Sequence, residues 1–274
     1  MKKLVLFIFA ITTSIVNAQD LVKVKGNREV TTEISPLNSF DYLEISGDYE
    51  IEIVPGVAPQ IEITTDSNLH QYLAASVVDG KLVVTTTARI RSKKEMKFRI
   101  IYGPELNKIT VTEDAQLSSV TSLTFDDLEL NIKEDAEVYM TANVARLNLY
   151  AEKSTKAELN LTGKTAVINL EDNAEIKALI KYSDLELNAK DRVDARIEGD
   201  VDSGIINLKD RSSIEFKNLV FDKLDLKIKN NTNAQVNVKG NFYLESTDDA
   251  EVSLYGSPSI KINKFTGKSV LKKE

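Results

Sequence analysis

Five pairs of adjacent acidic residues are the first candidates for chemistry in this sequence of 274 residues. Converging carboxylates are the ligands that calcium prefers, so such pairs could form cation sites. The glycine-rich nonapeptide of calcium-binding β-rolls is absent, however, and the chain has only 11 glycines. We therefore interpret the pairs as solvated turns that keep the protein soluble, and predict no metal site. The pairs are Glu113-Asp114, Asp126-Asp127, Glu134-Asp135, Glu171-Asp172 and Asp248-Asp249.

Catalytic chemistry has weaker support. A glycosidase needs two carboxylates about 5–10 Å apart, and a catalytic pair should occur at one place, whereas acidic residues recur along most of this chain. Nucleophilic catalysis lacks its usual residues, because the chain has no cysteine and a single histidine, His70. We assign His70 a surface or packing role and predict no catalytic residue and no cofactor.

Two sets of polar residues could bind a ligand. Arg89, Arg91, Lys93 and Lys94, followed by Lys97 and Arg99, form the most basic stretch. It could hold an anionic polymer such as a cell-surface polysaccharide, or it could be a strand edge protected by charge. The second set consists of outward residues on the repeated strands, among them Asn131, Asn148, Tyr150, Asn188 and Asn207. Asparagine is disfavoured in strands, so this set is either an external hydrogen-bonding face or a stacked ladder that stabilises the fold.

A repeated sequence motif must position these residues. A small residue followed two places on by an apolar residue occurs eight times from Ala115 to Ala250, at a mean spacing of about 19 residues. Around it, apolar residues alternate, as in Leu128, Leu130 and Ile132, which indicates strands with one buried face. The eight pairs are Ala115/Leu117, Ala136/Val138, Ala157/Leu159, Ala174/Ile176, Ala195/Ile197, Ser212/Ile214, Ala234/Val236 and Ala250/Val252.

A coil explains this repeat better than an antiparallel meander. In a coil each copy is one rung stacked on the last, so that equivalent residues lie about 4.8 Å apart. We expect alanine to lie on alanine at a narrow inside corner. The predicted fold is all-β, a right-handed parallel β-helix (solenoid), with the hand taken from the general preference of crossover connections. It has a less regular N-terminal β-rich head.

The segments follow from this pattern. Residues 1–18 resemble a signal peptide, with Lys2 and Lys3 before an apolar run and Val16-Asn17-Ala18 as cleavage site. Residues 19–35 are a lead-in or linker, 36–104 the head or irregular early rungs, 105–267 the regular repeats, and 268–274 a polar tail. Within the head, Asp79-Gly80 predicts a hairpin, and residues 68–75 a short helix capped by Ser67. Lysines from Lys261 to Lys273 would blunt the final edge.

Export and charge limit the possible partners. Without the signal peptide the chain has 33 basic and 42 acidic residues, a net charge of −9, which argues against nucleic-acid binding. No apolar run is long enough for a transmembrane segment. We expect an exported protein located in the periplasm, on the outer-membrane surface or outside the cell. The sequence leaves its oligomeric state open.

Three segments in a distinctive order resemble a known bacterial family. They are Phe40 to Gly56, the Val78 to Val83 hairpin and the strand ending at Tyr102-Gly-Pro-Glu-Leu106, followed by the repeated turns and Tyr255-Gly-Ser-Pro258. The family is the putative auto-transporter adhesin, head GIN domain, and the resemblance covers roughly residues 40–267. This chain has an acidic pair and alanine in most turns where the family has Ser-Gly-Ala. The resemblance implies an exported β-helical protein and carries over no catalytic motif.

These observations predict a non-catalytic exported protein that presents a polar face for adhesion, with a cell-surface polysaccharide or an envelope protein as partner. The alternative is a structural, envelope-associated protein that interacts with itself. A carbohydrate-active enzyme on the same fold is the least favoured interpretation.

Overall fold

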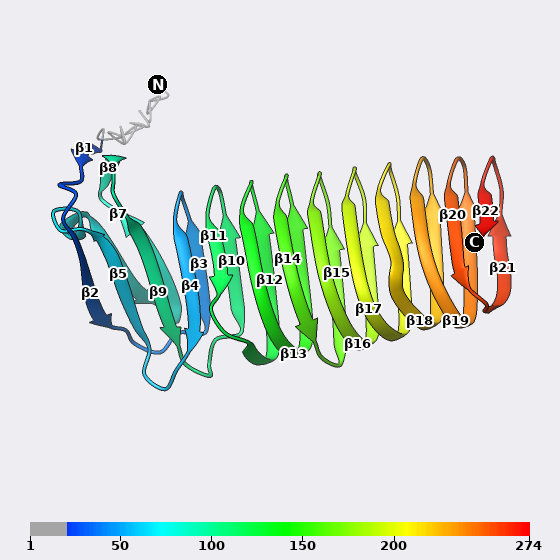
Figure 1. Ribbon diagram of the computed structural model, residues 1–274, viewed down its shortest axis with the longest axis horizontal. Helices are drawn as coiled ribbons and strands as arrows, with labels where there is room; N and C mark the ends of the chain where they lie inside the picture. Colours follow the sequence, from blue (N-terminus) through cyan, green and yellow to red (C-terminus); the bar gives the residue numbers. More distant parts are fainter. Residues whose placement is uncertain (1–20) are drawn as a thin grey trace, which may run out of the picture.

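The computed structural model describes residues 21–274, which form a long stack of β-strands (Figure 1). The predicted signal peptide, residues 1–18, lies outside the described residues. Within residues 21–274 the chain has no helix that is long and apolar enough to cross a membrane. Successive strands form the rungs of a parallel β-helix, which confirms the predicted fold class.

The N-terminal third contains short strands and one short 3₁₀ helix. Their bounds are β1 (Val22–Lys25), β2 (Val30–Pro36), β3 (Tyr42–Ser46), β4 (Glu50–Pro55), β5 (Gln60–Asp66), η1 (His70–Tyr72), β6 (Leu73–Val78), β7 (Lys81–Thr86), β8 (Ala88–Ser92) and β9 (Met96–Tyr102).

The remaining strands are longer, and several of them bend from one sheet into the other. Their bounds are β10 (Lys108–Thr112), β11 (Gln116–Ser119), β12 (Leu123–Lys133), β13 (Glu137–Glu152), β14 (Lys156–Thr162), β15 (Thr165–Leu170), β16 (Glu175–Ala189), β17 (Asp194–Leu208), β18 (Ser213–Lys229), β19 (Asn233–Thr247), β20 (Glu251–Gly256), β21 (Ser259–Phe265) and β22 (Val270–Lys273).

Each rung contributes one segment to each of two parallel sheets. From β10 to β22 nine consecutive rungs follow one another in chain order. The first sheet contains β10, β12, the second halves of β13 and β16–β19, β15 and β21. The second sheet contains β11, the first halves of the same long strands, β14, β20 and β22. A continuous apolar core fills the space between the sheets.

The inward residues alternate in size from rung to rung at one corner of the coil. The rung with Ile132, Ala136 and Val138 is followed by the rung with Ala151, Thr155 and Ala157. All six are buried. In the strand register Ile132 pairs with Ala151 and Val138 with Ala157, and Ala136 and Thr155 come immediately before the paired residues Glu137 and Lys156. Large side chains therefore face small ones along the stack, an arrangement that suits close packing of the corner. The same alternation continues in Leu170, Ala174 and Ile176, then Ala189, Val193 and Ala195.

This alternation, which runs from Ala136 to Ala195, corrects the expectation that alanine lies on alanine along the whole stack, although Ala115 does lie beside Ala136. The small residues Ala115, Ala136, Ala174, Ser212 and Ala250 do precede equivalent strands, and they are buried. Ala157, Ala195 and Ala234 instead pair with the apolar residues of neighbouring rungs, as Ala157 does with Val138 and Ile176. In those rungs the corner itself holds a β-branched residue: Thr155, Val193 or Thr232.

In the head the order in space differs from the order in the chain. The rung formed by β3 and β4 lies between β10 and β11 on one side and β7 and β9 on the other. Three antiparallel strands then close this end: β6 pairs with β7, β5 with β9, and β2 with β5. We call β2, β5 and β6 the N-terminal cap. The predicted lead-in, residues 19–35, thus supplies β1 and most of β2 to the folded structure.

Two local predictions in the head have different outcomes. The hairpin at Asp79-Gly80 is confirmed, because both residues have positive φ and Val78 pairs with Lys81. The predicted helix over residues 68–75 is wrong in extent. Only His70–Tyr72 form a 3₁₀ turn, Leu69 rather than Ser67 occupies the cap, and β6 begins at Leu73. The alternating pattern from Leu73 to Val78 forms a strand because it can pair with β7.

Candidate functional site

The acidic turns have a backbone explanation. Two consecutive residues with positive φ precede the corner in several rungs, namely Glu134-Asp135, Lys153-Ser154, Asp172-Asn173, Asp191-Arg192 and Asp210-Arg211. Aspartate and asparagine tolerate this left-handed conformation better than most residues do. Backbone geometry thus favours aspartate at these turns. The predicted turn at Asp126-Asp127 is wrong, because both residues lie within β12.

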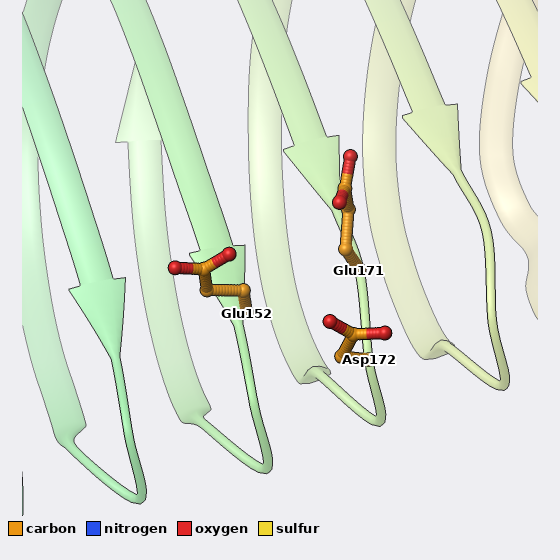
Figure 2. A group of neighbouring side chains, drawn as sticks. All are labelled: Glu152, Glu171 and Asp172. Atoms are coloured by element: carbon orange, nitrogen blue, oxygen red, sulfur yellow. The ribbon is translucent and has the colours of Figure 1, made fainter.

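One group of three acidic side chains comes together within residues 21–274: Glu152, Glu171 and Asp172, whose carboxylates lie within 4.8 Å of one another (Figure 2). Lysines already neutralise two of them. Lys133 Nζ is 3.3 Å from Glu152, and Lys190 Nζ is 2.9 Å from Glu171. The Tyr150 hydroxyl, at 3.3 Å, also donates to Glu152. These contacts satisfy Glu152 and Glu171 from within the protein.

The basic stretch divides into parts that face different surroundings. Arg89, Arg91 and Lys93 border one hollow of about 500 Å³ beside Tyr49 at the N-terminal end. In the described chain, Lys93 is the one of these three with a carboxylate within 4 Å: Asp48, at 3.8 Å.

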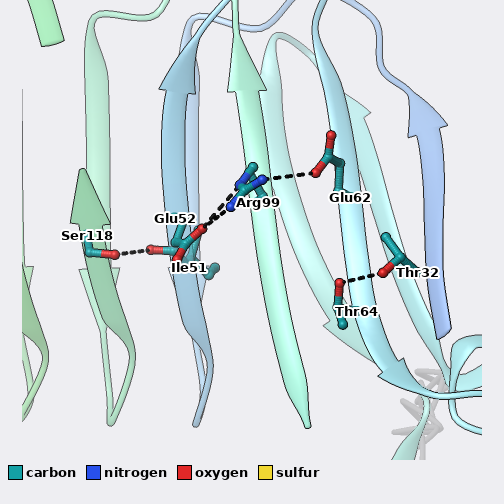
Figure 3. A network of polar contacts seen from close by, with 7 residues as sticks. All are labelled: Thr32, Ile51, Glu52, Glu62, Thr64, Arg99 and Ser118. Atoms are coloured by element: carbon teal, nitrogen blue, oxygen red, sulfur yellow. Dashed lines mark hydrogen bonds and ion pairs between the residues drawn. The ribbon is translucent and has the colours of Figure 1, made fainter. Parts of the chain in front are cut away.

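The other basic residues serve the framework. The backbone N–H of Lys94 donates to buried Asp66 at 2.6 Å. Arg99 on β9 donates to Glu52 on β4 at 3.0 Å and lies 3.6 Å from Glu62 on β5 (Figure 3). Arg99 therefore links the cap to the coil across three strands. His70 is likewise a packing residue, since it is buried and its Nε2 lies 3.0 Å from the Thr31 hydroxyl.

The asparagines of the first sheet form a ladder. Asn188 donates to Asn169 at 3.0 Å, and Asn207 donates to Asn188 at 2.8 Å. Asn131 donates to Glu129 at 2.9 Å. Their amides thus bond with one another and with neighbouring side chains, as in the stabilising ladder that the sequence left open. Asn148 lies in the adjacent outward row and is exposed.

Tyr150 shares the outward row of Asn131 and Asn169. Its partial burial, with Glu152 and Glu171 nearby, raises its pKa to about 12. The tyrosine is therefore a neutral hydrogen-bond donor at any physiological pH, which suits packing against the carboxylates better than proton transfer.

A groove on the outer face of the second sheet was not predicted. It has a volume of about 620 Å³ and crosses β11, β13, β14, β16 and β17. We call it the axial groove, because it crosses the stacked strands and therefore follows the long axis of the coil. One wall is the row Tyr139, Glu158, Lys177 and Arg196, and the other is Thr141, Asn160, Leu179 and Glu198.

The walls of the axial groove combine balanced charge with apolar surface. Lys177 lies 3.8 Å from Glu158, and Arg196 lies 3.3 Å from Glu198. Leu179 is 52% exposed although leucine normally favours the core. The sequence held one signal of this site, an apolar residue at an outward strand position, but the same signal occurs at Val167 and Ile205, which are exposed outside the groove.

The family comparison matches most of the chain. The model of the putative auto-transporter adhesin, head GIN domain, matches residues 39–179 and 160–258. The chain belongs to this family. No curated protein matches the chain.

Solved structures with a similar fold carry related names. A putative adhesin from Parabacteroides distasonis has 14% identity and a TM-score of 0.68, and the match covers 91% of this chain and 99% of that one. A putative adhesin from Parabacteroides merdae has 19% identity and a TM-score of 0.64, with 92% and 99% covered. A putative lipid binding protein from P. distasonis has 18% identity and a TM-score of 0.64, with the same coverage.

These similarities establish that the head GIN domain chain shares its fold with the three proteins. None of the three names, nor that of the family, is that of an enzyme. In this head GIN domain the two carboxylates that line the axial groove, Glu158 and Glu198, lie beside basic side chains.

Proposed function

We propose that this protein is a non-catalytic, exported adhesin that binds an extended, uncharged surface polysaccharide along the axial groove. The observation that carries the proposal is a groove of about 620 Å³ that crosses five stacked strands. Because outward side chains recur at about 4.8 Å along the axis, the groove offers an extended line of hydrogen-bonding and apolar contacts. An extended polymer matches such a surface better than a compact ligand does.

The chemistry of the walls supports a neutral glycan. Asn160, Glu158 and Arg196 supply both hydrogen-bond donors and acceptors for hydroxyl groups. Tyr139 and the exposed Leu179 supply apolar surface on opposite walls. Two acidic and two basic side chains line the walls, so a strongly charged polymer would gain little from the groove. Membership in an adhesin family and the predicted signal peptide support a location in the periplasm, on the outer-membrane surface or outside the cell.

The test is retention of the mature protein on an array of neutral and acidic polysaccharides. We expect binding to neutral polymers, and a loss of at least tenfold in apparent affinity for Leu179→Asp. The matched control is Val167→Asp, which places the same charge at an exposed outward position of the first sheet, away from the groove. It should bind as the wild type does.

Vesicles of phosphatidylethanolamine and phosphatidylglycerol form the contrasting arm, because one structurally similar protein is named a putative lipid binding protein. Binding to vesicles but to no glycan would replace the polysaccharide with a lipid. Equal losses for Leu179→Asp and Val167→Asp would remove the groove as the binding site.

A further inference from the structure

The last rung of the coil leaves its core side chains uncovered. Ile260, Ile262 and Phe265 occupy the inward positions of β21 and are 41–49% exposed. Their register partners one rung earlier, Phe242 and Leu244 among them, are completely buried. All seven residues of β21 are exposed. The side of β21 that faces away from β19 therefore presents an apolar surface and unpaired backbone groups. These two features favour pairing with another strand.

Contacts between neighbouring rungs show which side chains suit a strand placed against this edge. Lysines repeatedly lie against glutamates on a neighbouring rung: Lys108 and Lys133 face Glu129 and Glu152 on the following rung, at 2.9 and 3.3 Å, and Lys190 faces Glu171 on the preceding rung, at 2.9 Å. Inward positions meet apolar residues in the next rung. A strand that continued the stack would thus alternate apolar and acidic residues.

The charge of the terminal rungs fits the same partner. Residues 205–274 contain 12 basic and 9 acidic residues, whereas residues 105–204 contain 11 basic and 21 acidic residues. At the edge itself, Lys261 and Lys264 are exposed, and in the described chain neither has a carboxylate within 4 Å. The end of an acidic protein is thus locally basic.

We propose that the C-terminal edge, formed by β21 and β22, docks an acidic β-strand segment of a partner protein by extending both parallel sheets. Apolar side chains of the partner cover Ile260, Ile262 and Phe265, and its carboxylates face Lys261 and Lys264. The partner is therefore a segment with period-two apolar residues and an excess of Asp and Glu. This surface is separate from the axial groove.

A second copy of this chain fits the edge poorly. Two copies joined end to end would bring together two sets of five lysines from residues 261–273, with Glu274 as the one acidic residue that follows Ser259. Like charges facing one another across strands are destabilising. Charge complementarity thus favours a foreign acidic strand over self-association.

The probe is a synthetic peptide with the sequence of residues 127–140, an acidic rung of this same chain that carries the required pattern. Its binding to the mature protein is measured by fluorescence anisotropy at low and high salt. We expect saturable binding that weakens with salt, at least tenfold weaker for a peptide with Glu129→Lys and Glu137→Lys. A peptide with Leu128→Ser and Leu130→Ser should also lose binding.

Protein variants locate the site. Lys261→Glu combined with Lys264→Glu should weaken binding of the acidic peptide at least tenfold and favour the charge-reversed peptide. Lys164→Glu combined with Lys181→Glu makes the same charge change at exposed positions within the stack and should have no such effect. Absence of binding, or equal binding of both peptides, overturns the proposal. A dimer in light scattering that dissociates on Ile262→Glu also overturns it, since a second copy would then occupy the edge.

Discussion

The two ends of this β-helix are closed in different ways. At the N-terminal end, β9 carries fully buried Phe98 and Ile100, because β5 pairs with it and β2 pairs with β5. At the C-terminal end, the equivalent inward residues of β21 are exposed and the edge carries lysines. The stacking of similar rungs therefore does not specify how each end of the coil is closed. Within residues 21–274, one end is closed by antiparallel strands, whereas the other ends in exposed strands that carry lysines.

Truncating one inward side chain at each end tests most directly whether the two ends differ in burial. Phe98→Ala removes a buried ring that packs edge-on against Tyr49, with 5.2 Å between ring centroids. We expect a loss of roughly 3–5 kcal/mol in the free energy of unfolding. Ile262→Ala, at an exposed position, should cost less than about 1 kcal/mol. Urea denaturation monitored by circular dichroism measures both.

Comparable losses for the two variants would show that the C-terminal edge is covered in solution. Their ratio therefore reports directly on whether the two ends differ, and a partner strand bound at β21 should raise the cost of Ile262→Ala.

Between the ends, the buried corner residue Ala136 allows a further test. Ala136→Leu overpacks a fully buried position between Ala115 and Thr155, and overpacking typically costs about 1–3 kcal/mol. Glu137→Leu changes the next residue, which points outward, and should alter the free energy of unfolding by less than about 0.5 kcal/mol. Thermal and urea denaturation of both variants give the difference. Equal effects would mean that the inward and outward faces have been exchanged.

The regular part of the coil could be predicted because its rules are local. Period-two alternation from Leu128 to Ile132 and a recurrence near 19 residues leave few architectures. The alignment of alanines failed at Ala157 because a residue type does not reveal strand register. Thr155 fills the corner there, and the small Ala157 follows two residues later. The side-chain volume available between neighbouring rungs decides whether alanine or a β-branched residue occupies the corner.

The head and the groove depended on contacts that a sequence does not display. Nothing in residues 42–46 indicates that they pair with both residues 81–83 and residues 108–112. The axial groove forms from outward residues of five strands, of which Leu179 alone has an unusual type for its position. By contrast, Arg89, Arg91 and Lys93 border one hollow, as their proximity in sequence suggested, whereas Lys94 and Arg99 serve the framework.

Alkaline pH should weaken the packing around Tyr102. Burial of Tyr102, at the end of β9, raises its pKa to about 12 from an ordinary value of 10.0. Because the folded value is the higher one, the stabilisation is complete below pH 10 and is lost as the pH rises from 10 towards 12. One group contributes at most about 1.4 kcal/mol per pH unit in this range. Urea denaturation at pH 9 and 11 should show a smaller decrease for Tyr102→Phe than for the wild type.

The smallest effect is expected at Tyr182, in the middle of the stack. Its hydroxyl is buried and has no hydrogen-bond partner within the described chain. Burying an unsatisfied polar group costs free energy, whereas removing it leaves the ring packing unchanged. Tyr182→Phe should therefore be neutral or stabilise the protein by up to about 1 kcal/mol, as measured by urea denaturation. A loss beyond about 1 kcal/mol would reveal an ordered water or an unrecognised acceptor at the Tyr182 hydroxyl. The middle of the stack would then contain a buried polar contact in addition to its apolar packing.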